Sequence, residues 1–459
     1  MPPSVPERIS DLVIWVVVAI IIVLIHRRAS GPGTGLVASF IAGLWLMHWT
    51  GGFLYVLPWF YYTNLTLVWE GFKQSSYGLF AFGAGVLIIS ILRYSNILRV
   101  KPANNADRIT TLANLPRNYL LVGIVSYLVV FPSSIILPSL TAVSSTSNMF
   151  IIIGLCLFCW RAARDGDTLK LVFWLMAGLL LPVYTVTALG FLGFGVAAFL
   201  SLITFVTGVV RLRLSFIIAL LLMVFFALSF YVTYMRDRSD LRASLGSENG
   251  INERIDRFGT MISTFEWFDI TNKDHLHRID ERLNQNTLLG AAIYNLNTGR
   301  VRYVYGETLL QAVVNLVPRA IWPDKPIHLG GNTVVSYFTG MRFAIGTTVG
   351  VGQLMDAYIN FGTYGVIAVF FALGLAVASF DGAAASAIQH GDWKRFAFWY
   401  LSGTGFIQPN NALFEITATI AGGMLSAFLV NRFILPRFMP STVDTSFTIY
   451  PTVPPTGQK

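Results

Sequence analysis

Long runs of apolar residues are the feature that most limits what this chain can fold into. A helix needs about 20 mainly apolar residues to cross the roughly 30 Å hydrocarbon layer of a bilayer. Eleven runs approach that length, near residues 10–25, 35–57, 78–93, 119–137, 149–160, 170–187, 191–210, 214–235, 362–381, 396–413 and 416–431. They lack the alternation of a membrane barrel, and backbone groups in lipid must be satisfied within each segment, so we expect helices throughout.

Charge content agrees with a chain that spans a membrane many times. Only 12% of the residues are charged, whereas a soluble domain carries about 25%. The first apolar run is followed, not preceded, by Arg27 and Arg28, which is the reverse of a cleaved signal peptide. We therefore expect this run to remain as a membrane helix with its N-terminus outside.

The net charge of +9 indicates orientation and not nucleic-acid binding. With the N-terminus outside, 17 Lys and Arg residues fall in inner segments, while the short outer segments hold only Arg8 and Lys73. This distribution follows the positive-inside rule. The long segment 236–345 holds 13 basic and 12 acidic residues, so it is too balanced to serve as a polyanion-binding arm.

These observations predict an all-α polytopic membrane protein with about 11 transmembrane helices and one large extracytoplasmic loop. The expected parts are a membrane bundle of about eight helices (1–235), a periplasmic loop (236–345), a C-terminal membrane part with a re-entrant segment and about three helices (346–436), and a disordered cytoplasmic tail (437–459).

The loop 236–345 itself contains two helical patterns. Leu276, Ile279 and Leu283 recur at helical spacing, which predicts an amphipathic helix with Arg278 and Arg282 together on another face. The later stretch ETLLQAVVNLVP has an apolar part of about ten residues, too short to span, and suits an interfacial or re-entrant helix. Pro318 ends it.

Basic side chains in the second half of this loop are candidates for binding phosphate. Arg278, Arg282, Arg319 and Lys325 are expected near the outer membrane surface, where a guanidinium group could hold a phosphate by two hydrogen bonds. Prolines at 318, 323 and 326 restrict the backbone around Arg319, as a preorganised site requires. The alternative is that these cations pair with nearby carboxylates and lipid headgroups.

Acidic residues inside apolar segments are the other candidates, because an intramembrane carboxylate is costly and often functional. Asp356 stands in GTTVGVGQLMDAYINFG (346–362) beside Tyr358 and Asn360, and Glu415 follows Gln408-Pro-Asn-Asn411. We expect the four side chains Asp356, Tyr358, Asn360 and Glu415 to line one cavity. Glu415 could instead form a structural hydrogen-bonded pair, and Glu70 in the first outer loop could replace either acid.

Four other patterns lack the context that a metal or cofactor site needs, so we expect neither. They are Asp165-Gly-Asp167 in a short inner turn, Cys156 and Cys159 inside an apolar run, His275 and His277 on different helix faces, and Gly350-Val-Gly352, which follows no strand.

Four segments together resemble the Wzy-type oligosaccharide repeat-unit polymerases of bacterial O-antigen, capsule and exopolysaccharide assembly. They are R-x-x-x-R-L-N-Q-N at 278–286, Y-x-Y-G-E-T at 303–308, V-P-R-A-I-W-P-D-K-P at 317–326 and G-Q-L-M-D-A-Y-I-N-F-G-T-Y-G at 352–365. The similarity is detailed over about 278–381. Elsewhere it rests on hydropathy and on the single large outer loop.

The resemblance implies an inner-membrane glycosyltransferase on a GT-C-like scaffold that works by metal-independent, inverting transfer. Its substrate would be an oligosaccharide on undecaprenyl pyrophosphate, and a chain-length regulator would be a possible partner. The family's dependence on outer arginines implies catalytic roles for Arg278 and Arg319, with Arg282 and Lys325 binding substrate. Asp356 would be the base or orienter of the acceptor hydroxyl. An O-antigen ligase and a lipid-linked oligosaccharide flippase remain the alternatives.

Overall fold

The computed structural model describes most of the chain. The described residues are 3–30, 33–60, 64–95, 114–126, 149–182, 185, 193–209, 214–243, 250–317, 322, 324, 330–343 and 349–438. Of the expected sites, Arg319 and Lys325 lie outside these residues, as does nearly all of the tail after residue 436.

Helices make up the ordered elements of the described residues, which contain no strand. The elements are α1 (Val5–Ser30), α2 (Leu36–Leu44), η1 (Trp45–Trp49), α3 (Thr50–Leu54), α4 (Leu65–Tyr94), α5 (Leu115–Val125), α8 (Phe150–Arg164), α9 (Thr168–Gly178), α11 (Gly193–Val209), α12 (Leu214–Ala243), α13 (Gly250–Ser263), α14 (Lys273–Leu283), α15 (Asn286–Asn297), α16 (Glu307–Val314), α17 (Gly331–Thr339), α18 (Gln353–Gln389), α19 (Trp393–Thr404), α20 (Leu413–Leu429), η7 (Val430–Ile434) and η8 (Leu435–Phe438).

Five helical segments in the described part of the chain are long and apolar enough to cross a membrane. They are Val5–Ala29, Leu36–Leu54, Leu65–Tyr94, Gln353–Gln389 and Leu413–Phe438. Two further apolar helices, Thr168–Pro182 and Gly195–Gly208, are shorter. The architecture is therefore that of a helical membrane protein.

Five spans are fewer than the eleven expected from hydropathy, and two observations account for five of the six missing runs. The sixth run, 214–235, lies in the 30-residue helix α12, which is not among the five spans. Parts of the runs at 119–137, 170–187 and 191–210 lie outside the described residues. Elsewhere the helices are short, since α8 has 15 residues and α19 has 12. The spans that are present also extend beyond their apolar runs: α4 begins at Leu65, although its apolar run begins near residue 78.

Close packing of α4 against α18 forms the centre of the molecule. Gly78 and Gly85 of α4 face α18, whereas Gly71, seven residues earlier, lies against Asn286 of α15. A side chain at Gly85 would overlap the backbone of Phe371, and one at Gly374 would overlap the backbone of Phe82. Small residues let helix backbones approach in this way, so this pair fixes where the start of α18 lies.

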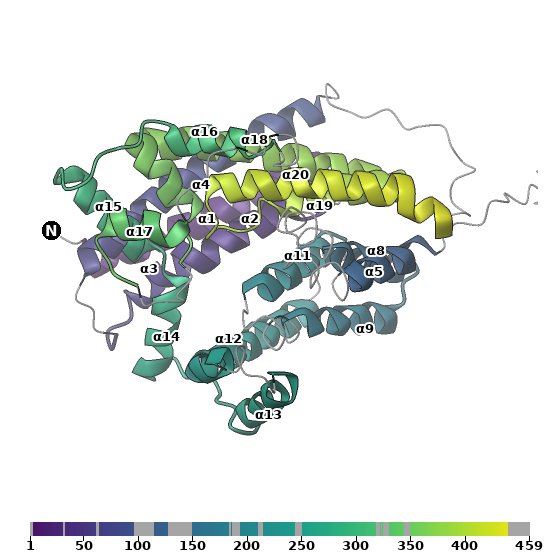
Figure 1. The fold of residues 1–459 in the computed structure, drawn as a ribbon, viewed down its shortest axis with the longest axis horizontal. Helices are drawn as coiled ribbons and strands as arrows, with labels where there is room; N and C mark the ends of the chain where they lie inside the picture. Colours follow the sequence, from purple (N-terminus) through teal and green to yellow (C-terminus); the bar gives the residue numbers. More distant parts are fainter. Residues whose placement is uncertain are drawn as a thin grey trace, which may run out of the picture.

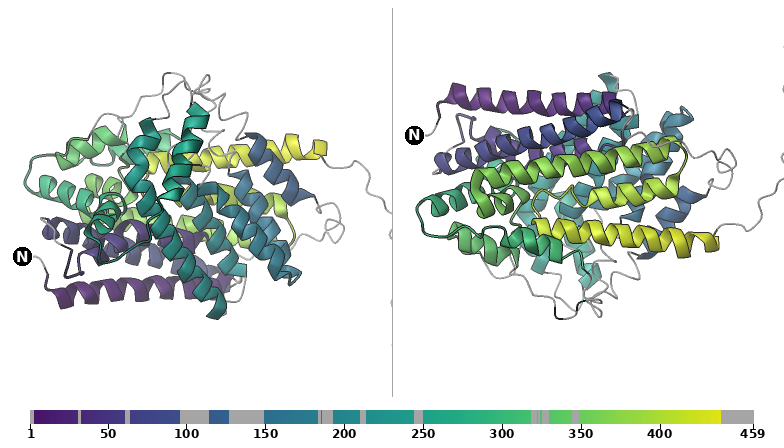
Figure 2. Two further views of the ribbon diagram at one scale, coloured as in Figure 1. Left: turned by 90° about the horizontal axis from the view of Figure 1, so that it is seen from below. Right: turned by 90° about the horizontal axis from the view of Figure 1, so that it is seen from above.

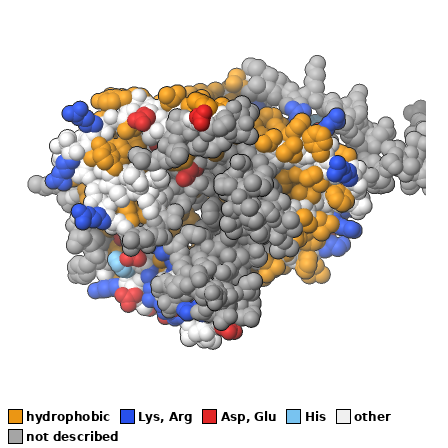
Figure 3. Space-filling model, in the orientation of Figure 1, with side chains coloured by type: hydrophobic (Ala, Val, Ile, Leu, Met, Phe, Trp, Pro, Cys, Tyr) orange, Lys and Arg blue, Asp and Glu red, His pale blue; other side chains and the backbone are white. Residues whose placement is uncertain are grey.

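Three helices from the second half of the expected outer loop lie toward one end of the molecule. In Figure 1, α15, α16 and α17 lie at the end where α1 begins, while α20 ends at the opposite end. The two views of Figure 2 agree, and the view from below shows α12 and α13 crossing one side of the bundle. Figure 3 shows Lys and Arg side chains at the left and lower left and along the right margin, with hydrophobic ones along the upper edge.

Candidate functional site

Three segments that are distant in the sequence meet where α18 begins. The Gly352 N–H donates to Asn410 O and the Gln353 N–H to Pro409 O, each at 3.0 Å. Gly352 has a positive φ of 76°, and a side chain there would overlap the amide of Gln285. Only glycine fits both constraints. The segment that carries Asp356 is thereby held against the end of α14 and the loop before α20.

Asp356 is buried at this junction, with 1% of its surface exposed. Its carboxylate accepts a hydrogen bond of 2.7 Å from the backbone N–H of Leu413, the first residue of α20. The hydroxyl of Thr308 on α16 also bonds to it. A carboxylate at a helix N-terminus is stabilised by the unpaired N–H groups there. Asp356 therefore joins α16, α18 and α20.

Asn360 is fully buried one turn further along α18. Its amide nitrogen donates to Thr308 Oγ1 and to Asp356 O, both at 2.6 Å, and its side-chain oxygen accepts from the Gly306 N–H at 2.9 Å. The side chain thus holds the loop before α16 against α18. All its hydrogen bonds are internal, so its role in the structure is to position neighbours.

The helix α18 is broken immediately after Asn360. Phe361 (φ −141°, ψ 25°) and Gly362 (φ 62°, ψ −145°) are not helical. The expected re-entrant segment over 346–362 is therefore helical from Gln353 to this break. Its polar side chains are buried between helices, which is why hydropathy places the start of the membrane helix only at residue 362.

An aromatic groove lies beside the break. It has a volume of about 650 Å³ and is lined by Tyr303, Tyr305, Asn360, Phe361, Tyr364, Gly365 and Ala368. We refer to these seven residues as the aromatic groove. Tyr305 has the unusual φ of 45° and is 75% exposed. Such a strained backbone is frequent at binding sites. Tyr358 is buried, with its ring centre 6.4 Å from that of Tyr303.

Glu415 lies in the first turn of α20, close to Asp356. Its Oε2 accepts a hydrogen bond of 3.1 Å from the Ala412 N–H. Two carboxylates thus share the N-terminus of α20, and both bond to its backbone. Glu70, the other acid considered from the sequence, forms an exposed ion pair with Lys73 at 2.9 Å.

Arg278 is paired with a carboxylate that the sequence analysis did not single out. Its Nη1 donates to Glu266 Oε2 at 3.1 Å, and Arg236 donates to the other oxygen at 2.6 Å. Burial opposes ionisation of Glu266, but the hydrogen bonds from Arg236 and Arg278 outweigh it and hold the pKa of Glu266 below its ordinary value. The charge of Arg278 is therefore largely compensated.

Arg282 differs from Arg278 although both lie on α14. Burial, and then the like charge of Arg238, lower the pKa of Arg282 from its ordinary value. Within the described part of the chain, no carboxylate forms an ion pair with it. A half-buried guanidinium of this kind is suited to an anionic ligand. It stands three residues before Gln285, which contacts Gly352.

The remaining histidine and aspartate patterns have structural partners. His275 is buried and accepts from the Asp269 N–H at 3.1 Å, whereas His277 is exposed beside Glu281. Asp167 caps α9 by accepting from the Lys170 N–H at 3.0 Å. Among the described residues no group of three or more His, Cys, Asp or Glu side chains could hold a metal ion.

The structure places Asp356, Asn360 and Glu415 together where α18 and α20 begin, but of the four side chains expected to line one cavity only Asn360 lines the aromatic groove. Tyr358 faces Tyr303 instead, and Arg278 and Arg282 lie on α14. Three contributors were not singled out as site residues from the sequence: Thr308 and Gln285, which stand in the segments of the resemblance, and Glu266. Gly306 stands directly before α16, so the sequence could have indicated that Thr308 lies in the first turn of a helix. No local signal identifies Gln285 or Glu266, since their partners are far away in the sequence.

Comparison with protein-family models, with curated proteins and with solved structures finds no match to this chain in any of the three. The fold and the apolar helices define its class as a helical membrane protein. A more particular assignment depends on the residues of the site.

Proposed function

We propose that the chain polymerises oligosaccharide repeat units linked to undecaprenyl pyrophosphate, as the Wzy-type enzymes do. One observation carries the proposal. Three segments of that resemblance meet at the start of α18, because Gln285 lies against Gly352, and Gly306 and Thr308 bond to Asn360. They are far apart in the chain and meet only in the folded protein.

The proposed reaction is an inverting glycosyl transfer. The bond between the anomeric carbon of the growing chain and its pyrophosphate oxygen breaks, and a bond forms to a hydroxyl of the incoming repeat unit. The hydroxyl loses its proton, and undecaprenyl pyrophosphate leaves with the bonding electrons. Fixed cations aimed at the leaving group stabilise the charge that develops on it.

Arg282 has the first role in this proposal, because it is half-buried and without a described carboxylate partner. Arg319 and Lys325 are proposed to assist it, as the resemblance implies. Arg278, compensated by Glu266, acts mainly by holding α14. Asp356 acts as a positioning residue, because its bonds to Leu413 and Thr308 hold α20 and α16 against α18. Asn360 and Glu415 make further hydrogen bonds to the same helix starts.

The aromatic groove is proposed to receive the lipid carrier. Phe361, Tyr364 and Ala368 lie on the candidate span Gln353–Gln389, so the groove would open toward lipid. Tyrosine rings such as Tyr303 and Tyr305 are typical of the membrane interface, where one end of a side chain is wet. The pyrophosphate would then lie between the groove and α14.

The finer architecture belongs to the same proposal. We propose about eleven spans on a GT-C-like scaffold in the bacterial inner membrane, with the N-terminus periplasmic and the C-terminus cytoplasmic. The substrate and membrane lipids are the proposed partners, together with a chain-length regulator. No nucleic acid takes part.

A deletion strain tests the function. We expect its surface glycan to be limited to single repeat units on a gel, with the ladder restored by the wild-type gene. Full-length polymer left on the lipid carrier would indicate a ligase instead. Single units trapped on the cytoplasmic leaflet would indicate a flippase.

A buried cluster at the far end of α1 favours the flippase as the second candidate. The carboxylate of Asp381 lies 3.1 Å from His26 Nε2 and accepts from the Thr34 N–H at 2.9 Å. Asp381 is 1% exposed and His26 is 2% exposed. Intramembrane carboxylate and histidine pairs serve as proton relays in transporters. Replacing Asp381 with Asn would stop polymer formation at the transport step only if this candidate is right.

A further inference from the structure

One face of α12 is covered along only the later half of its length. It is formed at helical spacing by residues 218, 222, 225, 226, 229, 233 and 236. The loop 264–268 lies on the later half, where the N–H of Glu266 donates to Thr233 Oγ1 at 3.0 Å. The N–H of Phe268 donates to Ser229 Oγ at 2.9 Å. These two bonds fix the loop to α12.

The earlier half of the same face is apolar and exposed. The exposed fractions lie between 41% and 65% for Ile218, Leu222, Phe225 and Phe226. On a helix that packs against a core, apolar residues at this spacing are the ones that become buried. We call these four residues the open face of α12.

Two aromatic rings of the loop stand at the border between the two halves. The ring of Trp267 stacks on that of Phe225 with the ring centres 5.8 Å apart, and the ring of Phe265 stacks on that of Phe226 at 5.6 Å. Trp267 and Phe265 also meet edge to face at 5.2 Å. The loop thus extends the open face by two rings, and Trp267 is 61% exposed.

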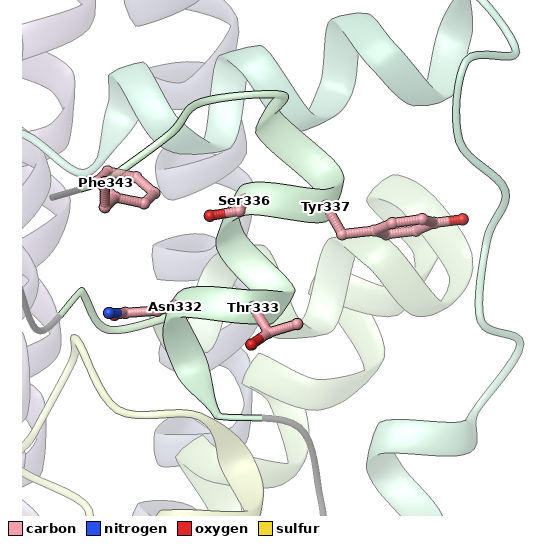
Figure 4. A pocket seen from close by; sticks show the side chains of 5 residues that line it. All are labelled: Asn332, Thr333, Ser336, Tyr337 and Phe343. Atoms are coloured by element: carbon pink, nitrogen blue, oxygen red, sulfur yellow. The ribbon is translucent and has the colours of Figure 1, made fainter. Parts of the chain in front are cut away.

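An exposed aromatic ring is not by itself a sign of a contact surface. Tyr337 on α17 is 59% exposed, but Thr333 and Ser336, which precede it on that helix, are polar. Figure 4 shows the side chain of Tyr337 extending away from those of Ser336 and Phe343. Trp267 differs because its ring continues an apolar surface, and such surfaces mark contacts with membrane or protein.

The charges along α12 indicate how the open face lies in a bilayer. Residues 214–235 contain no charged side chain, and Arg236 is the first that follows. A helix rises about 1.5 Å per residue, so Phe226 lies about 15 Å along the axis from Arg236, and Ile218 about 12 Å further. With Arg236 at the headgroups, the open face therefore falls inside a hydrocarbon layer about 30 Å thick.

The side chains of the open face favour lipid over a second protein helix. Helix pairs inside a membrane meet through small residues or polar side chains, as α4 and α18 do here at Gly85 and Gly374. The open face and the two rings beside it are instead all large and apolar. Acyl chains can cover such a surface without a matching partner.

We propose that the open face of α12, together with Phe265 and Trp267, contacts the acyl chains of the bilayer and anchors the loop 264–268 in the membrane. This contact follows from the surface of α12 alone and is independent of the reaction proposed above. Glu266, next to Trp267, pairs with Arg278 of α14. The anchor therefore holds α14 at a fixed distance from the membrane.

Quenching of a fluorophore by spin-labelled lipids tests the contact. The variants Leu222→Cys, Trp267→Cys and Thr298→Cys are made in full-length protein without Cys156 and Cys159. They are labelled with NBD and placed in nanodiscs of phosphatidylcholine and phosphatidylglycerol, with the nitroxide either near the headgroup end of the acyl chains or near their far end.

We expect quenching at positions 222 and 267, with the far-end nitroxide acting more strongly at 222, because Leu222 lies deeper than Phe225 and the ring stacked on it. Thr298, the exposed residue after α15, is the control and should be quenched by neither nitroxide. Equal quenching at 267 and 298, or none at 222, would overturn the proposal. So would efficient disulfide formation between two chains at position 267, since a second copy would then cover the face.

A neutral replacement tests the anchor without a label. Trp267→Gln removes the ring and leaves the charges around Glu266 unchanged. Withdrawing one large apolar side chain from lipid changes an equilibrium by roughly tenfold or more, so protease should cleave the segment 256–283 about tenfold faster in nanodiscs. Tyr337→Gln, at an exposed ring outside this surface, should leave the rate unchanged. Equal rates for Trp267→Gln and the wild type would contradict the anchor.

Discussion

At the scale of single residues, the described polar side chains of the proposed site divide into those that hold helices together and a half-buried arginine that no described carboxylate pairs with. Asp356 and Asn360 bond to backbone groups of other elements. Arg282 has no such described partner. The sequence singles out Asp356 and Arg282 because acids and arginines are rare in an apolar chain, and Asn360 because it follows Asp356 closely. It could not separate their roles, since the partners Leu413 and Gly306 act through their backbone.

Replacement of Asp356 separates a positioning role from that of a base. Asp356→Asn keeps an oxygen that can accept from the Leu413 N–H, whereas Asp356→Ala leaves that buried group unpaired. An unpaired buried group costs about 1–3 kcal/mol. We expect Asn to retain part of the ladder and Ala to lose it, with a lower melting temperature for Ala. Equal loss in both variants at wild-type stability would indicate a base.

Paired arginine variants test the anion site. Arg282→Ala should abolish the ladder without lowering the melting temperature, because it removes a half-buried charge close to Arg238. Arg278→Ala should lower the melting temperature by removing a bond to Glu266, and should reduce the ladder less. Gel analysis and thermal unfolding of the purified proteins measure the two effects. The reverse ranking on the gel would contradict the role given to Arg282.

Acid should loosen the outer loop through Glu266. The pKa of Glu266 is depressed in the folded protein. Its contribution to the stability of the fold is therefore fully present above its ordinary pKa of about 4.5, and this stability is lost as pH falls through the lower folded pKa. We expect protection of α13 and α14 from proteolysis to fall with pH in this range. In the variant Glu266→Gln, this pH-dependent loss of protection should be absent. An identical pH profile in both proteins would argue against the ion pair.

At the scale of elements, the sequence indicated several helices but not how they pack. The spacing of Leu276, Ile279 and Leu283 predicted a helix, which is present as α14 with these three side chains buried. Hydropathy missed the first nine residues of α18, because Gln353, Asp356 and Asn360 are polar yet buried against other helices. Their partners become visible only when the elements are assembled.

Glycine replacements test the contact between α4 and α18. A methyl group in Gly85→Ala would overlap the backbone of Phe371, so we expect the protein to lose several kcal/mol of stability, on the order of other overpacked cores. Gly259→Ala in α13 meets nothing within 4 Å and should be neutral or stabilising by up to about 1 kcal/mol. Thermal unfolding in detergent measures both. Equal stability of the two variants would contradict the close packing.

At the scale of the whole molecule, the apolar runs indicated a helical membrane protein, and the described helices have that character. The number of spans could not be read from hydropathy alone, because runs of similar length belong to helices from 12 to 37 residues long. The sequence placed the start of the first apolar run and the segment 236–345 on the same side of the membrane, and α15, α16 and α17 lie at the end where α1 begins (Figure 1).

Cysteine labelling tests the orientation of the molecule. Thr298, which directly follows α15, and His390, which directly follows α18, are both exposed. In a variant without Cys156 and Cys159, a cysteine at position 298 should react with a membrane-impermeant maleimide in intact spheroplasts. A cysteine at position 390 should react only after permeabilisation. Labelling of both positions from the same side would contradict the proposed topology.

The central claim, that this chain alone joins repeat units, is tested most directly by reconstitution. The purified protein is placed in liposomes with lipid-linked repeat units extracted from the deletion strain, and the products are separated on a gel. The account predicts a ladder at multiples of one repeat unit with the wild type, and single units with Arg282→Ala. Single units with a folded wild-type protein would contradict it.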